Sequence, residues 1–186
     1  MQQQPKIELE SFMGKEIFKI SGKYGVYLGL FLCAFTIFMW VTGLDTTYYE
    51  VGKTLELVVS AVPVVAILYA IYRLNRRMKL TVFQRLVAGF TVGLVSIAVS
   101  APFIEIYHLY INPEWFEAVL RVQEQHMVDS GAKPEEIISR LERMEANNTT
   151  INSVLGAFAF GGILFPAVVS FLSLIIIRNK KKDVSP

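Results

Sequence analysis

The sequence predicts an all-α polytopic membrane protein with four transmembrane helices and a two-helix extracytoplasmic hairpin between the third and fourth spans. Hydrophobic residues make up 53% of the 186 residues and charged residues only 18%, and the mean hydropathy is +0.45. This balance excludes an ordinary soluble domain of the same size. The apolar residues also gather in four blocks without Asp, Glu, Lys, Arg or His, at 24–44, 57–72, 86–104 and 154–177.

Each block is predicted to cross the membrane as a helix, because about 20 apolar residues span the hydrocarbon core in that conformation. Transmembrane strands would alternate in hydropathy, and these blocks do not. The second block is short, and Leu55 together with snorkelling Lys53 and Arg73 extends it. Within one membrane domain, 1–186, the predicted spans are 24–44, 55–72, 81–111 and 153–177.

The distribution of basic residues predicts the orientation, because Lys and Arg are retained on the cytoplasmic side. Of the 18 basic residues, 13 lie in the segment 1–23, in the connection 73–85 or in the tail 178–186. The other two connections carry 11 carboxylates. Both termini are therefore expected in the cytoplasm, as an even number of spans requires.

The segment 1–23 is not expected to be a cleavable signal, because the apolar stretch that follows it is too long and has no small-x-small cleavage site. Its apolar residues recur at roughly helical spacing, which predicts a separate short helix on the inner leaflet. A frayed polar tail is the alternative. The apolar positions are Leu9, Phe12, Met13, Ile17 and Ile20.

The third connection, 112–150, reads as a helical hairpin. Asn112-Pro113-Glu114 offers a capping side chain, a proline at the first helical position and an acid in the first turn. The first helix should end near Asp129, and the second should run from Pro134 to Ala146. The apolar stripes expected on the two helices are Trp115, Val119 and Val122, and Ile137, Leu141 and Met144. Aromatic residues expected at the headgroup level are Trp40, Tyr48, Tyr49, Tyr107, Tyr110, Trp115 and Phe116.

If Arg85 snorkels at the inner face, a helix that starts there has crossed the hydrocarbon core by about Ile104. Glu105 and His108 are therefore predicted at the outer headgroup boundary. Pro102 should bend the helix just before them. Glu-x-x-His is half of a di-iron motif, but His126 has Gln123 at the matching position. An interfacial pair, salt-bridged or solvated, is favoured, and a metal site that recruits Glu56 stays open.

Small residues four apart flatten faces on three spans, which favours close helix packing. The pairs are Gly25 and Gly29, Gly89 and Gly93, and Ala157 and Gly161. Packing within one bundle and homo-oligomerisation are both compatible with them. The single cysteine, Cys33, excludes an intrachain disulfide, and no nucleotide-binding or catalytic motif is present, so no cofactor and no catalytic residue are predicted.

Several stretches together resemble one bacterial membrane family, domain of unknown function 4199, found mainly in Bacteroidota. They are "INPEW", "DSGAKPEEIISRLERME" and the glycine-rich last span "GAFAFGGILFPAVVSFLSLIIIRNKKK". The likeness covers Lys19 to Lys182. It implies a bacterial cytoplasmic membrane and a periplasmic hairpin, and it brings no activity, cofactor or catalytic residue.

The sequence favours a non-enzymatic accessory, sensor or assembly protein. Besides the lipid bilayer, its expected partner is another membrane or periplasmic protein, or a second copy of the chain, and nucleic acid is not expected. The residues expected to carry the interaction are Glu117, Glu124, Glu135, Glu136 and Glu142. One alternative is a small transporter or channel component with an outer vestibule near Glu56, Glu105 and His108. Another is a membrane metalloenzyme that uses Glu105 and His108.

Overall fold

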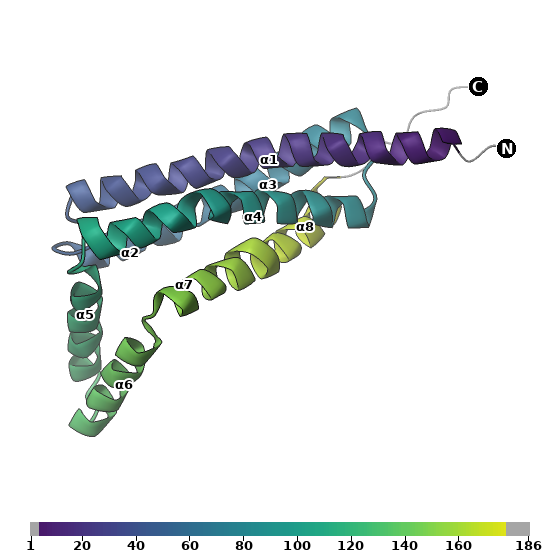
Figure 1. Cartoon of the computed structure of the whole chain (residues 1–186). Helices are drawn as coiled ribbons and strands as arrows, with labels where there is room; N and C mark the ends of the chain where they lie inside the picture. The colour runs from purple at the N-terminus through teal and green to yellow at the C-terminus, as the bar shows by residue number, and fades with distance from the viewer. Residues whose placement is uncertain (1–3, 178–186) are drawn as a thin grey trace. The chain divides into compact units, whose positions relative to one another are not determined.

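The computed structural model describes residues 4–177, and every regular element in this range is helical (Figure 1). The basic tail 178–186 lies outside the described residues. The helices in chain order are α1 (Gln4–Val41), α2 (Tyr49–Val59), α3 (Ala61–Arg77), α4 (Val82–Ile106), the π-helix η1 (Tyr107–Ile111), α5 (Trp115–Asp129), α6 (Pro134–Asn147), α7 (Thr150–Gly156), the π-helix η2 (Ala157–Leu164) and α8 (Phe165–Ile176).

Four helical stretches within the described residues are long and apolar enough to cross a membrane, which confirms the prediction of an all-α protein with four candidate transmembrane helices. They are Met13–Val41, Tyr49–Arg77, Val82–Ile111 and Asn152–Ile176. In the third of them 44% of the most apolar window is buried inside the protein, against 17–28% in the other three. The third span is therefore the most buried of the four, and the other spans expose more of their apolar side chains.

The separate amphipathic helix predicted before span 1 is wrong as a separate element, because α1 runs without a break from Gln4 to Val41. Pro5 is the one proline in this range, and it lies in the first turn, where a missing amide hydrogen costs nothing. At 1.5 Å per residue the 38 residues extend for about 57 Å, well beyond a hydrocarbon core of about 30 Å. The helix ends three residues before the predicted boundary at 44, where Gly43 adopts a φ of 68°.

The second span is longer than the predicted 55–72 and contains an interruption at Ser60 between α2 and α3. Pro63 explains the interruption. Since proline has no amide hydrogen, it donates no helical hydrogen bond to the carbonyl of Val59. The Ser60 hydroxyl instead donates to the carbonyl of Leu57 at 2.6 Å.

Contacts divide the chain into two compact units. The first consists of the described residues up to Gly29, together with Val62–Ala98 and the residues from Phe158 onward. Its core lies along one face of α3 and one face of α4. The side chains that are at most 1% exposed there are Ile67, Ala70, Ile71, Leu74, Ala88 and Val92.

Glycines let helices of the first unit approach closely. A Cβ built on Gly25 would lie 2.7 Å from the Cβ of Val95 on α4. One built on Gly93 would lie 2.9 Å from the carbonyl oxygen of Gly161 in η2. Gly89 likewise leaves no room for a Cβ, because Ser170 of α8 lies against it. Of the other two small residues, Gly29 is buried and Ala157 is exposed. These intramolecular contacts occupy the flat faces of Gly25, Gly89, Gly93 and Gly161.

Arg85 does not snorkel to the membrane surface as expected, because its side chain is buried, with the residue only 2% exposed. Nη1 donates to the carbonyl of Ser173 at 2.7 Å, and Nη2 donates to the carbonyl of Ile177 at 3.0 Å. The last carbonyls of a helix have no partner within it and carry partial negative charge. The guanidinium therefore caps α8 and fastens its end to α4.

The Gly93→Ala variant should lower the free energy of unfolding by about 1–3 kcal/mol, the usual cost of overpacking. The added methyl group would meet the backbone carbonyls of Gly161 and Gly162, at 2.9 and 3.1 Å, and these cannot rotate away as a side chain can. Thermal unfolding in detergent measures the change. Gly22→Ala is the matched control, because a Cβ there meets nothing within 4 Å. An equal shift in both variants would contradict the close approach.

Candidate functional site

A buried group of three polar side chains lies in the second compact unit, which consists of Leu30–Ala61 and Val99–Ala157. We call Asp45, Tyr107 and Asn112 the polar cluster. Their residues are 6%, 2% and 6% exposed. Oδ2 of Asp45 accepts hydrogen bonds from the Tyr107 hydroxyl and from the Asn112 amide, the latter at 2.8 Å. The Asn112 amide also donates to the Tyr107 oxygen at 2.8 Å.

The π-helix η1 makes the polar cluster possible. The backbone N–H of Asn112 donates a hydrogen bond to the backbone carbonyl of Tyr107 at 2.8 Å, so a single hydrogen-bonded turn joins two residues five apart. In an α-helix, residues five apart point about 140° away from each other. The wider turn brings Tyr107 and Asn112 to one side, where both reach Asp45. Single π-turns within α-helices are rare and are found frequently at functional sites.

The third member, Asp45, lies in the tight turn between α1 and α2. The Tyr48 amide donates to the carbonyl of Gly43 at 2.8 Å, which closes the turn. A Cβ on Gly52 would collide with the carbonyl of Leu44, so the turn lies directly against α2. The polar cluster thus ties the connection between spans 1 and 2 to the end of span 3.

One carboxylate oxygen of Asp45 has no hydrogen-bond donor among the described residues. Oδ1 is buried and accepts no hydrogen bond from them. Leaving a buried polar group unsatisfied costs about 1–3 kcal/mol, and more when it is charged. The carboxylate is therefore held in place by the two donors on its other oxygen.

Glu105 and His108 line one cavity of about 260 Å³ beside the polar cluster. The His108 ring stacks on the indole of Trp115, with 4.2 Å between ring centroids and 13° between their planes. Among the described side chains, no hydrogen bond or ion pair joins Glu105 to His108. Glu56 does not line this cavity. Across residues 4–177, no three His, Cys, Asp or Glu side chains form a group suited to a metal ion.

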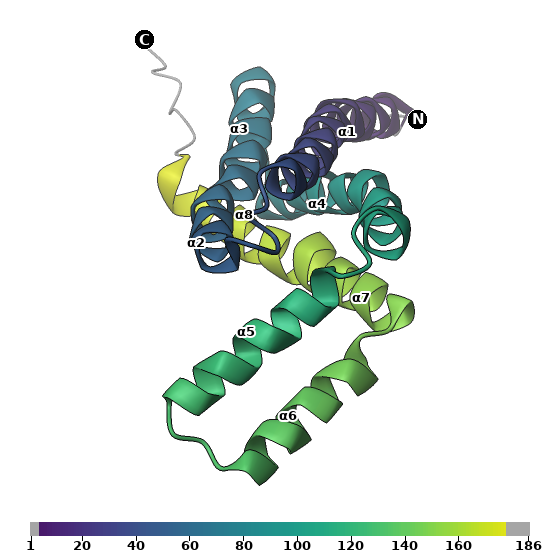
Figure 2. The same ribbon diagram turned by 90° about the vertical axis from the view of Figure 1, so that its left-hand side faces the viewer.

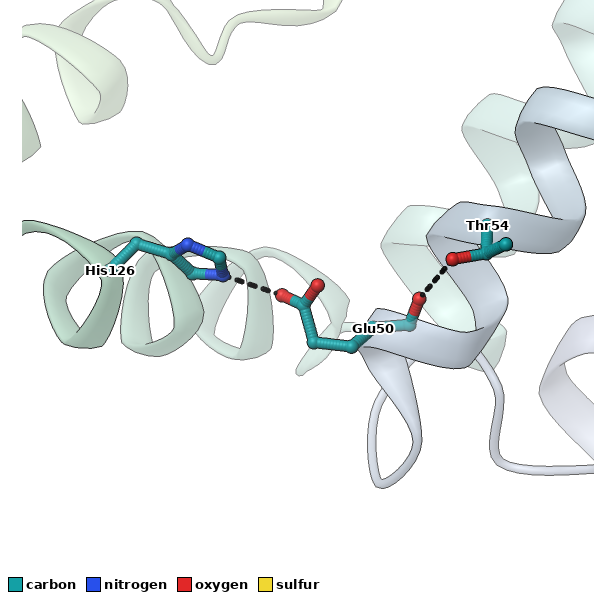
Figure 3. A network of polar contacts seen from close by, with 3 residues as sticks. All are labelled: Glu50, Thr54 and His126. Carbon is teal, nitrogen blue, oxygen red and sulfur yellow. Dashed lines mark hydrogen bonds and ion pairs between the residues drawn. The ribbon is translucent and has the colours of Figure 1, made fainter. Parts of the chain in front are cut away.

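A second polar link joins α5 to α2. Nε2 of His126 lies 2.7 Å from Oε1 of Glu50, and the carbonyl of Glu50 accepts a hydrogen bond from the Thr54 hydroxyl at 3.1 Å (Figure 3). Both side chains of the pair are more than half exposed, at 55% and 58%. An exposed pair of this kind contributes about 0–1 kcal/mol. It can therefore guide the position of α5 against α2 but adds little stability.

Helices α5 and α6 run side by side and are joined by a short turn at Gly131, whose φ is 76° (Figure 2). The predicted cap by Asn112 is wrong, because α5 begins at Trp115 with Glu114 at the N-cap position and has no side-chain cap. Helix α6 begins at Pro134 as expected, and Glu136 accepts a hydrogen bond from the Lys133 amide at 3.4 Å. Ala118 and Ile137 are buried along the pair. The five glutamates expected to carry an interaction are all exposed: Glu117, Glu124, Glu135, Glu136 and Glu142.

Sequence reasoning missed the polar cluster and the pair of His126 with Glu50. It placed Tyr107 and Tyr110 at the headgroup level, which stays a prediction, and it did not foresee that Tyr107 is only 2% exposed whereas Tyr110 is 78% exposed. No signal in the sequence indicates the π-turn that separates these two environments. Asp45, the one carboxylate in the turn between α1 and α2, was a usable signal for a buried contact.

The Tyr107→Phe variant should lower the free energy of unfolding by about 1–3 kcal/mol, because the buried carboxylate of Asp45 loses one of two donors. Thermal unfolding in detergent checks this. Tyr110→Phe removes the same hydroxyl from the same π-helix at an exposed position and should have no measurable effect. Equal stability of the two variants would show that the polar cluster does not hold the turn.

A family model described as "Protein of unknown function (DUF4199)" matches residues 23–179, most of the chain. No curated protein and no solved structure matches. The match confirms the resemblance drawn from the hairpin and the last span, and the chain belongs to this family.

Proposed function

We propose that this protein is a non-enzymatic accessory, sensor or assembly protein of the bacterial inner membrane, and that it presents the α5–α6 hairpin to a partner protein in the periplasm. In this topology both termini lie in the cytoplasm, as the distribution of basic residues favours. The observation that carries the proposal is the acidic, exposed surface of the hairpin.

The hairpin has a large excess of negative charge. Residues 112–150 contain eight carboxylates and four Lys or Arg side chains, a formal net charge of −4 with His neutral. Ala118 on α5 and Ile137 on α6 are buried, whereas the carboxylates of the hairpin are exposed. Charged surfaces of this kind steer association and select partners of opposite charge. A basic surface on a membrane or periplasmic protein is the matching partner.

Contacts near both ends of α5 connect the hairpin to the spans. Asn112, just before α5, belongs to the polar cluster, and His126 near the end of α5 pairs with Glu50 on α2. A partner that displaces α5 would therefore disturb contacts with α2 and with the turn at Asp45. This connection supports a sensing or assembly role in preference to a passive anchor.

A photoreactive amino acid at position 124 or 142 should form a discrete cross-linked adduct with a partner protein in native membranes. Replacing Glu117, Glu135 and Glu136 with Gln in the same chain should weaken the adduct, and raised salt should do the same, because both reduce charge attraction. Denaturing gel electrophoresis followed by mass spectrometry measures the adduct.

Two controls accompany this experiment. The photoreactive group at position 137, which is buried between α5 and α6, should give no adduct with another protein. Replacing Arg140 and Arg143 with Gln changes two exposed charges on the same hairpin and should leave the adduct intact or strengthen it. Adducts that are unaffected by loss of the glutamates would count against the proposed acidic surface.

A small transporter or channel component is the second candidate, since Glu105 and His108 line one cavity at the end of the third span. Replacing both with Gln should abolish ion flux in reconstituted vesicles if the cavity is a vestibule. Glu56→Gln should leave such flux unchanged, because Glu56 lies outside this cavity. Absence of flux from the unmodified protein would reject this candidate and leave the first one standing.

A further inference from the structure

A second cavity lies beside the polar cluster, and we propose that it binds the zwitterionic headgroup of a phospholipid with a primary amine, the phosphatidylethanolamine class. The cavity has a volume of about 530 Å³, within the range of small-molecule sites. It lies wholly in the second compact unit. Its polar and aromatic lining comes from Trp40, Thr46, Thr47, Asn112, Glu114 and Arg121.

One wall of the cavity carries two opposite charges, Glu114 at the N-cap position of α5 and Arg121 within the helix. Glu114 and Arg121 are seven residues apart, which places them two helical turns and about 10 Å apart along the axis. Ala118 lies between them and is buried, so no long side chain fills the space. Within the described chain, neither Glu114 nor Arg121 forms an ion pair. The cavity therefore offers a separate carboxylate and guanidinium to one ligand.

This pair of charges suits a phosphate joined to an ammonium group. A guanidinium binds phosphate oxygens through two parallel hydrogen bonds, and the hydroxyls of Thr46 and Thr47 add further donors. The carboxylate of Glu114 accepts hydrogen bonds from a primary ammonium. A quaternary ammonium has no hydrogen to donate, so a choline headgroup loses this interaction.

The buried Asp45 adds to the preference for a ligand with positive charge. Its carboxylate accepts a hydrogen bond at 2.8 Å from Asn112, which is itself part of the cavity lining. Counting Asp45, two carboxylates and one guanidinium act on the cavity. A headgroup that carries only negative charge is therefore disfavoured compared with a zwitterion.

The position of the cavity along the spans indicates a lipid in preference to a soluble solute. Trp40 precedes Val41, the last residue of the first span, and Asn112 follows Ile111, the last residue of the third. Trp40 is 45% exposed. Tryptophan prefers the headgroup level of a bilayer, because its ring is apolar and its N–H donates a hydrogen bond. The cavity thus opens where the headgroups of this leaflet lie.

Native mass spectrometry of the delipidated full chain tests the proposal, with phosphatidylethanolamine, phosphatidylglycerol and phosphatidylcholine of identical acyl chains added at equal concentrations. The unmodified protein should retain phosphatidylethanolamine in preference to the other two. Arg121→Gln should weaken its binding about tenfold, the effect of losing one charge-assisted contact. Glu114→Gln should remove the preference over phosphatidylglycerol and phosphatidylcholine.

Matched controls use exposed charges that do not line the cavity. Arg140→Gln and Glu142→Gln on α6 should leave lipid retention unchanged. Equal retention of the three lipids by the unmodified protein would overturn the proposal, and so would an Arg121→Gln variant that behaves like Arg140→Gln. Displacement of the lipid by soluble phosphoethanolamine at equal concentration would also overturn it, because the acyl chains and the membrane would then contribute nothing.

Discussion

The hydrogen bonds to the carboxylate of Asp45 hold the turn between α1 and α2 against the end of the third span, and the arrangement of the second compact unit depends on them. The carboxylate accepts hydrogen bonds from Tyr107 and Asn112, which a π-turn brings to one side of the third span. A buried charge is costly unless polar groups surround it, so the turn between α1 and α2 has one favourable position against the end of α4. The cavity lined by Glu105 and His108 and the cavity lined by Glu114 and Arg121 both have Asn112 in their lining. Their geometry therefore follows from this arrangement.

The first compact unit is held by a different device with the same physical basis. Arg85 is a buried cation, and its guanidinium donates to the carbonyls at the end of α8, where no helical amide is available. Around it the helices contact each other through glycine faces, so that backbone atoms approach closely. Each unit thus combines close apolar packing with a buried ionisable group whose hydrogen bonds fix the ends of helices.

Much of the fold was predictable, because hydropathy over about 20 residues is a strong signal for a membrane helix. The third span, and the end of α5 and beginning of α6, lie within a residue of their expected positions, since proline, glycine and capping residues mark those boundaries. The turns at Ser60 and Tyr107 were not predictable in detail. Proline at 63 or 102 indicates a disturbed helix, but it does not indicate the form of the disturbance.

The site was less predictable than the fold, because its contacts join residues far apart in the sequence. Glu105 and His108 do line one cavity, yet His108 stacks on Trp115 and forms no ion pair with Glu105 in the described part of the chain. Asn112 was expected to cap α5 from its residue type, but it lies two residues before the N-cap position at Glu114, and its side-chain nitrogen donates to the carboxylate of Asp45.

The two π-helices change how the apolar pattern of this chain must be interpreted. A π-turn contains one residue more than an α-turn, so side chains after it are rotated by about 100° relative to the pattern before it. A single helical wheel drawn through the third or the fourth span therefore assigns lipid-facing and packed side chains to the wrong faces beyond residue 107 or 157. Separate wheels before and after η2, and a wheel for the third span that stops before η1, are needed to identify the surfaces that meet lipid.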